Sequence, residues 1–134
     1  SSKKEINMDL SELDQNVVQL FPSHALAIAK NKIIEMGHIT IEAVEGIRAY
    51  FETKNPLAKD GVYEMENAIN TLDSKITEYL VLISHETLND HDSNDYLANM
   101  KTIKDFERIG DHVVNICEWI EFNQTGKLNN TRLI

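Results

Sequence analysis

Residues 62–83 read VYEMENAINTLDSKITEYLVLI, and this stretch decides the fold class. Its apolar positions are separated by alternating steps of three and four residues: Val62, Met65, Ile69, Leu72, Ile76, Tyr79 and Ile83. Residues with this spacing lie on one face of an α-helix, so the stretch predicts a long amphipathic helix with one buried stripe. We place this helix at about residues 61–88, with Asp60 as its N-cap.

A second helical pattern precedes this stretch. Pro22-Ser23 is typical of a helix start and Asn55-Pro56 of a helix end, which predicts a helix over residues 22–53. Its expected seam has a heptad-like rhythm: Ile33, Gly37, Thr40, Val44, Ile47 and Phe51. A glycine inside a helix costs about 1 kcal/mol relative to alanine. We therefore expect Gly37 and Gly46 to be there because they permit close approach of neighbouring helices.

A third helix is expected at residues 94–123, after a polar turn in which Asp92 or Ser93 provides the N-cap. Its apolar stripe consists of Ile103, Phe106, Ile109, Val113, Ile116 and Ile120. Short loops between long helices force antiparallel neighbours. The sequence therefore predicts an all-α fold, an antiparallel up-down three-helix bundle over residues 22–125.

The segments outside the expected bundle are a polar N-terminal arm at residues 1–21 and a tail at residues 126–134. Apolar residues between Leu13 and Phe21 should pack either as an extended arm or as a short helical turn. The chain starts with Ser1-Ser2-Lys3-Lys4 and no methionine, as expected of an excised fragment. A membrane region is expected upstream of it.

Composition limits the classes of function. The 134 residues are 42% apolar and 26% charged, which is ordinary for one globular domain. The net charge of −9 argues against a surface that binds nucleic acid or anionic membranes. Cys117 is the single cysteine, which rules out an intrachain disulfide, and we expect it to be a small core residue.

Oxygen-bearing side chains recur along the third helix at intervals of four, four and three residues: Glu107, Asp111, Asn115 and Glu118. We call this row the acidic column; it runs beside the apolar stripe on one face of the helix. A similar row on the preceding helix comprises Glu66, Asn70 and Asp73. Two such rows brought together would form a cage of oxygen ligands, which suits magnesium, calcium, manganese or iron more than zinc. The alternative is a solvated polar face, in which Arg108, Lys75 and Lys104 relieve the repulsion between the carboxylates.

Other patterns typical of metal-binding or catalytic sites are incomplete. Glu35-Met-Gly-His38 supplies one Glu-x-x-His pair, whereas di-iron four-helix proteins use two. Residues 90–94 begin like a calcium-binding loop, but Asp95 replaces the required glycine and Lys101 the required glutamate. The sequence contains no glycine-rich phosphate loop and no Gly-x-Ser-x-Gly motif, so we do not expect an enzyme.

The segment Asp105-Phe-Glu-Arg-Ile-Gly-Asp111, followed by Asn115-Ile and Glu118, resembles the signature of PhoU-type domains, which regulate phosphate uptake. Residues 66–72, ENAINTL, are similar to the family's second-helix pattern. Residues 13–18 with Pro22 look like the lead-in of the version attached to bacterial sodium/phosphate cotransporters, as their cytoplasmic C-terminal domain.

The resemblance implies a fold made of three-helix bundles, two of them in the usual family member and one in this chain. It also implies an acidic motif, Glu/Asp-x-x-x-Asp, that holds multinuclear metal clusters. Glu107 and Asp111 match this motif, and the second-helix counterpart maps to Glu66 and Asn70, the latter in place of the usual aspartate. The expected metal ligands are Glu66, Asn70, Glu107, Asp111 and Glu118, for iron, manganese or magnesium.

The resemblance also implies a function: a cytoplasmic regulatory domain of a multi-pass, sodium-dependent phosphate transporter, without catalysis of its own. The expected partners are a second copy and the membrane region of the parent chain. Since one bundle fits in this chain, either the chain is truncated or two copies supply the two bundles. An acidic row left unpaired in a single bundle favours the homodimer. Two alternatives stay open. The chain is a stand-alone phosphate-uptake regulator, or a metal-dependent enzyme built on the same carboxylates.

Overall fold

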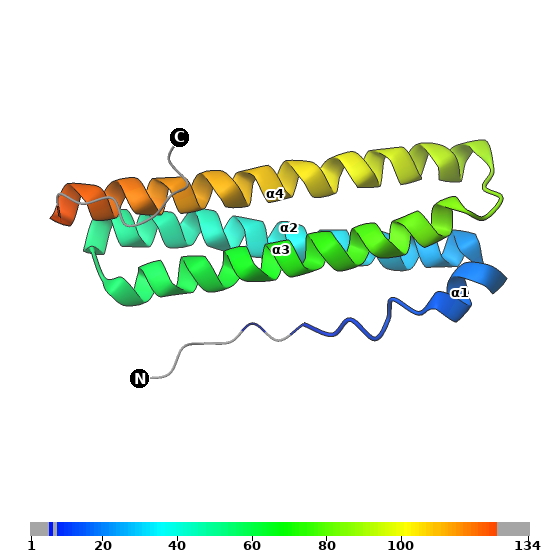
Figure 1. The fold of residues 1–134 in the computed structure, drawn as a ribbon, viewed down its shortest axis with the longest axis horizontal. Coiled ribbons are helices and arrows are strands. Elements are labelled where there is room, and N and C mark those ends of the chain that lie inside the picture. The colour runs from blue at the N-terminus through cyan, green and yellow to red at the C-terminus, as the bar shows by residue number, and fades with distance from the viewer. Residues whose placement is uncertain (1–5, 7, 126–134) are drawn as a thin grey trace.

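A computed structural model describes residue 6 and residues 8–125 of the chain (Figure 1). It contains four helices: α1 (Gln15–Leu20), α2 (Pro22–Thr53), α3 (Pro56–Ser84) and α4 (Asp90–Thr125). No strand occurs among these described residues, so the all-α class is confirmed. The count of three helices was too low, because part of the expected N-terminal arm forms the short α1. The expected tail at 126–134 lies outside the described residues.

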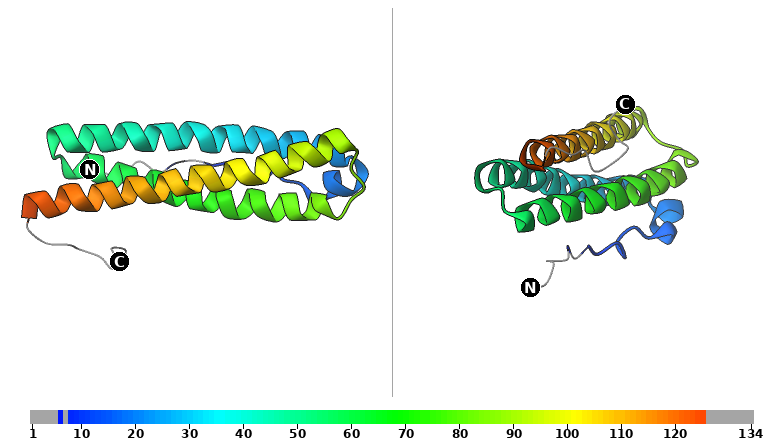
Figure 2. Two further views of the ribbon diagram at one scale, coloured as in Figure 1. Left: turned by 90° about the horizontal axis from the view of Figure 1, so that it is seen from above. Right: turned by 60° about the vertical axis from the view of Figure 1, so that its left-hand side comes forward.

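The three long helices lie side by side, and each packs against the other two (Figures 1 and 2). Because short turns join them in sequence, α3 runs antiparallel to both neighbours, while α2 and α4 run in the same direction. The expected stripe on α3 faces the centre: all of its members are buried except the half-buried Met65. Within the described part of the chain, no helix is long and apolar enough to cross a membrane.

The start of α3 differs from the prediction, because the dipeptide that ends α2 also begins the next helix. The bounds of α2 are as predicted, but α3 begins at Pro56 rather than residue 61. Asn55 accepts a hydrogen bond from the Leu57 N–H at 3.0 Å and Pro56 occupies the first turn, so the pair that ends α2 also starts α3. Asp60 is therefore inside the helix and is not its cap.

The turn between α3 and α4 is also displaced. The helix α3 ends at Ser84 instead of residue 88, and α4 begins at Asp90 instead of residue 94. The side chain of Asn89 accepts a hydrogen bond from the Asp92 N–H at 2.8 Å, which satisfies a free donor of the first turn. Asn89 is thus the cap, and the assignment of this role to Asp92 or Ser93 was wrong.

Two glycines of α2 mark close helix contacts, as expected. A Cβ atom at Gly37 would lie 3.0 Å from the ring of Phe106 on α4. A Cβ atom at Gly46 would lie 2.8 Å from a methyl group of Val62 on α3, closer than van der Waals contact allows. Only glycine permits α3 to approach α2 this closely at residue 46.

The expected seams of α2 and α4 are only partly buried. Val44 and Phe51 of α2, and Ile109 and Ile116 of α4, are exposed. The core side of α2 keeps three members of the expected seam and adds other residues: Ile33, Gly37 and Thr40 are kept, and Ala25, Leu26, Ala29, Met36, Ala43 and Tyr50 are added. Small alanines fill the space where three helices meet, and the larger apolar residues of α2 form a second stripe directed outward.

The N-terminal arm is fixed to the bundle by two polar side chains. The Tyr79 hydroxyl of α3 donates to the Asp14 carbonyl at 2.9 Å. Lys32 of α2 is buried, and its ammonium donates to the Asp9 carbonyl at 2.6 Å and pairs with Glu12 at 3.0 Å. Val18 of α1 joins the core. The arm is therefore part of the folded domain.

Candidate functional site

The acidic column lies on the side of α4 that faces α3. Lys104, one turn before the column, donates to Asp73 of α3 at 3.1 Å, and Glu121, just after it, pairs with Lys59 at 2.7 Å. These two contacts fix the register of the antiparallel helices along the whole column. The four-four-three spacing thus puts the column where α3 can supply further ligands.

Glu66 of α3 reaches the column at a glycine. A Cβ atom at Gly110 would lie 3.9 Å from Cγ of Glu66, so the missing side chain leaves room for this carboxylate beside Asp111. Glu66 is only 4% exposed, and its carboxylate accepts a hydrogen bond from the Asn70 amide at 2.8 Å. The structure therefore brings Glu66 to the acidic column, and Asn70 orients it from one turn away.

Glu107 and Asp111 form the half-buried middle of the column. Burial raises the pKa of the Glu107 carboxyl, and the charge of Asp111 and a hydrogen bond with it raise that pKa further. Lys104 opposes this effect, but its ammonium is engaged with Asp73. A carboxyl whose ionisation is opposed by burial and by a neighbouring charge attracts a proton or a cation.

Glu118 is the most deeply placed acid of the column, with 2% of its surface exposed. In the part of the chain that the structure describes, neither of its carboxylate oxygens finds a hydrogen-bond partner. A buried polar group without a partner costs about 1–3 kcal/mol, so such a group needs an explanation. Sequence spacing placed Glu118 in the column but gave no sign of this burial.

Cys117 adjoins Glu118 and has no reactive character. It is buried in the core, as expected. Burial raises the pKa of its thiol to about 12, so the thiol stays protonated at neutral pH. The thiolate is the form that attacks substrates and binds metals. Cys117 is therefore a packing residue.

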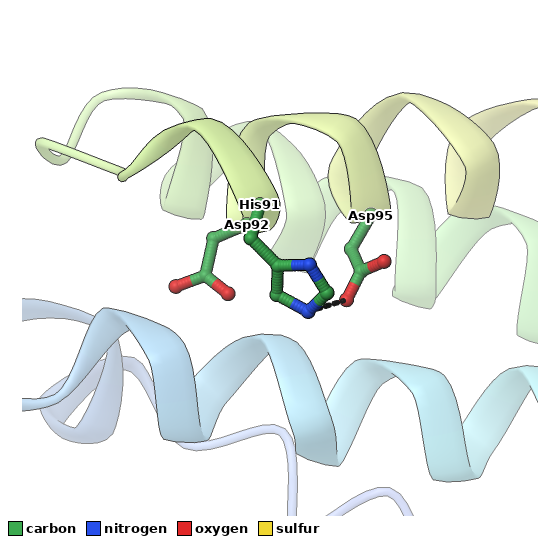
Figure 3. Close-up of side chains that lie close together, drawn as sticks. All are labelled: His91, Asp92 and Asp95. Carbon is green, nitrogen blue, oxygen red and sulfur yellow. Dashed lines mark ion pairs between the residues drawn. The ribbon is translucent and has the colours of Figure 1, made fainter.

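One compact group of potential ligands lies away from the column, at the start of α4. Among the described residues, His91, Asp92 and Asp95 are the group of three whose ligand atoms lie within 4.8 Å of one another (Figure 3). Each has a local role: Asp92 accepts a hydrogen bond from Ser23, and His91 pairs with Asp95 at 3.5 Å. His91 is exposed, and this cluster closes the polar turn that the sequence indicated.

The carboxylates of the column are consequently spread out rather than gathered around one point. From Glu107 to Glu118 the helix rises by about 16 Å. This length exceeds the reach of one ion, whose ligands lie within about 2.6 Å. The column offers hard oxygen donors in a row, which is suited to more than one cation.

Comparisons with known proteins agree with the resemblance in sequence. A protein from Xylella fastidiosa (strain Temecula1 / ATCC 700964), a phosphate-specific transport system accessory protein PhoU homolog, is 26% identical over 87 residues. The shared stretch is 65% of this chain but 36% of that relative. No solved structure matches the chain. The family model of the PhoU domain matches residues 33–120, a range that includes the acidic column and Glu66. The chain belongs to the PhoU domain family.

Proposed function

We propose that this chain is a regulatory domain of phosphate transport that binds metal cations along the acidic column. The ligands are Glu66, Glu107, Asp111 and Glu118, with Asn70 contributing its amide oxygen or orienting Glu66. The cation is iron, manganese or magnesium, since the donors are all oxygens. The domain has no catalysis of its own and acts through cation binding and contacts with partners.

Glu118 carries this proposal. A carboxylate that is nearly fully buried, with both oxygens unpartnered among the described residues, is stabilised when a cation supplies the missing contact. Glu107 supports the same conclusion, since burial and Asp111 already raise the pKa of its carboxyl. Cations bound at the two ends of the column would relieve these two effects separately.

Phosphate enters the proposal through the cation. The chain has a net charge of −9, which repels a free phosphate anion. A divalent or trivalent ion on the column reverses the local field and leaves coordination positions for phosphate oxygens. Phosphate should therefore bind to the metal-loaded protein and not to the metal-free one.

The test is calorimetric titration with Mn²⁺, followed by inorganic phosphate. The double variant Glu107→Ala with Asp111→Ala should lose the Mn²⁺ bound at the middle of the column, so the number of bound ions falls, while its helicity by circular dichroism stays unchanged. The matched control is Glu42→Ala with Glu78→Ala, which removes two exposed carboxylates elsewhere and should bind Mn²⁺ like the wild type. An equal number of bound ions in all three proteins would refute the metal site. Phosphate binding without metal would refute the bridging role.

The wider setting is also part of the proposal: a cytoplasmic domain of a sodium-dependent phosphate transporter, in contact with the membrane region of its parent and paired with a second copy. The full reading frame tests it. Several apolar spans upstream of residue 1 support the transporter setting. A frame without such spans favours the stand-alone regulator of phosphate uptake.

A further inference from the structure

An apolar strip runs along the side of the bundle where α2 and α4 meet. It comprises exposed residues of α2 and α4: Ile34, Ile41, Val44, Phe51, Ile109 and Ile116. These residues are between 39% and 58% exposed, and we call the strip the α2–α4 face. Helical spacing aligns the members of each helix on one side.

The middle of the α2–α4 face is hollow. A groove of about 440 Å³ lies there. Its apolar lining is Ile34, Gly37, Ile41, Val44, Phe106 and Ile109, and His38, Thr40 and Glu45 complete it. Because Gly37 has no side chain, Phe106 packs down onto the α2 backbone. Two ridges of aliphatic side chains therefore border a depression that a similar ridge can fill.

The fold of the chain itself does not need these side chains. The core side of α2 is made by Ala29, Met36 and Tyr50, among others, and these are buried without help from the outward stripe. A helix that is apolar on two sides normally has neighbours on both. Contiguous exposed apolar surface on a small domain marks an interaction site.

Glu45 is the acidic residue that lines the groove, and two charge pairs border the α2–α4 face. Arg48 pairs with Glu52 at 3.8 Å on α2, and Arg108 lies 3.4 Å from Asp105 on α4. The acidic column lies on another side of α4, toward α3. Two copies that each carry a net charge of −9 meet with least repulsion where apolar side chains and locally compensated charges predominate.

The size of the strip suits a weak dimer. Ile34 to Phe51 covers about 26 Å of helix, and two adjacent helices with their side chains are about 20 Å wide. The projected area of about 500 Å² is somewhat below the ~800 Å² per partner of a standard interface. Interfaces at this low end of the size range are typical of weak, transient association.

We propose that the α2–α4 face is a docking surface for a second copy of this chain, packed face to face about a two-fold axis. This inference rests on the homodimer in the proposed function and assigns its interface. The inference places the contact between copies on the α2–α4 face and not on the acidic rows. The acidic column then stays accessible to cations. Metal binding and dimerisation then use different sides of α4, so a substitution on one side leaves the contacting side chains of the other in place.

The experiment measures the mass of the full chain by analytical ultracentrifugation between 1 and 200 µM. Wild type should change from monomer to dimer over this range, and Ile41→Glu should stay monomeric because it places a charge in the apolar contact. Leu97→Glu is the matched control, since Leu97 is an exposed leucine of α4 outside the face and its variant should dimerise like the wild type.

Three outcomes overturn the assignment. The first is a monomeric wild type at 200 µM. The second is an equal loss of dimer in Ile41→Glu and Leu97→Glu. The third is a dimer that survives Ile41→Glu but dissociates with chelator or with Glu107→Ala, which would put the contact at the acidic column. A dimer that persists while Mn²⁺ binding fails would separate this inference from the metal site.

Isoleucine methyl NMR gives a second readout that does not depend on a variant. Dilution of the wild type should shift the methyl signals of Ile34, Ile41, Ile109 and Ile116, because these residues lose contacts when the dimer dissociates. The signals of Ile76 and Ile83, which are fully buried in the monomer, should stay in place. Shifts confined to other isoleucines would contradict the assignment.

Discussion

Glu118 shows how one residue links folding to function. Its carboxylate is removed from water, and within the described residues nothing compensates its oxygens. Replacing it with methionine keeps the length and packing of the side chain and removes the uncompensated group. We expect Glu118→Met to raise the free energy of unfolding of the metal-free protein by about 1–3 kcal/mol.

Urea denaturation in the presence of chelator measures this gain. Glu42→Met is the control, because an exposed glutamate on α2 should change stability by less than about 0.5 kcal/mol. Added Mn²⁺ should reduce or reverse the advantage of Glu118→Met, since ligand binding to the folded state stabilises the wild type. A metal-free variant that is less stable than the wild type would mean that Glu118 is already satisfied.

Glu107 provides a dependence on pH. Burial first, and Asp111 second, raise the pKa of its carboxyl above the ordinary value of 4.5, so the folded state holds this proton more tightly than the unfolded state. The contribution to stability is then complete at low pH and is lost as pH rises from about 4.5 through the raised pKa. Glu107→Gln should consequently gain stability relative to wild type between pH 4 and pH 7. Urea titrations at several pH values test this, and parallel stability curves for the two proteins would contradict it.

At the residue scale, spacing was enough to put Glu107 and Asp111 on one shoulder of a helix. It was not enough to find that Gly110 makes room for Glu66, because that requires the register between two antiparallel helices. Nor does a sequence position reveal burial: Glu118 is enclosed, while Asn70, a predicted ligand, is exposed and donates to Glu66. Neighbouring helices, rather than the acidic column itself, determine these properties.

At the element scale, the helices differ in how much of their role could be predicted. The stripe of α3 has large apolar residues on a single side, so its buried face was predicted well. The helix α2 carries large apolar residues on two sides, with alanines as well on the core side, so a search for large residues does not distinguish the buried side from the exposed one. The start of α3 was missed because Asn55-Pro56 both ends one helix and caps the next.

Two Gly→Ala substitutions, one at the contact between α2 and α3 and one away from it, should have opposite effects on stability. Gly46→Ala places a methyl group 2.8 Å from Val62, and the overpacking of about 1–3 kcal/mol exceeds the helix gain of about 1 kcal/mol. Gly61→Ala, inside α3, meets no described atom within 4 Å and should stabilise the fold by about 1 kcal/mol.

Thermal or urea unfolding of both variants measures these effects. The cost of Gly46→Ala should largely disappear in a Val62→Ala background, because the clashing methyl group is then absent. A destabilised Gly61→Ala, or a Gly46→Ala that is harmless beside intact Val62, would contradict the close approach of α2 and α3 at this point.

At the scale of the whole molecule, the arm and the bundle are joined through Lys32. Its buried ammonium contacts the Asp9 carbonyl, Glu12 and Glu35, the last at 2.9 Å. Lys32→Met should detach the arm without unfolding the bundle, because hydrogen bonds to a charged group contribute about 1.5–3 kcal/mol. Local opening of the arm should therefore become about 10–100-fold more frequent.

Hydrogen exchange followed by mass spectrometry resolves the arm from the bundle. Peptides covering Leu13 should exchange faster in Lys32→Met, while those covering Ile76 in α3 stay protected. Lys30→Met is the matched control, since Lys30 is exposed two residues away on the same helix. Equal exchange of the arm in both variants would show that Lys32 does not hold it.

The helix α4 is a single uninterrupted helix of 36 residues that faces α3 with its acids and α2 with its apolar residues. Because α4 contributes to both surfaces, cation binding and dimerisation become interdependent if the helix shifts or bends when either surface is occupied. Thermodynamic linkage then requires the two effects to be equal. The factor by which a bound cation changes the affinity of one copy for another equals the factor by which dimerisation changes the affinity for the cation. In the proposed function, a cation bound on one side of this helix would therefore change how many copies assemble on the other.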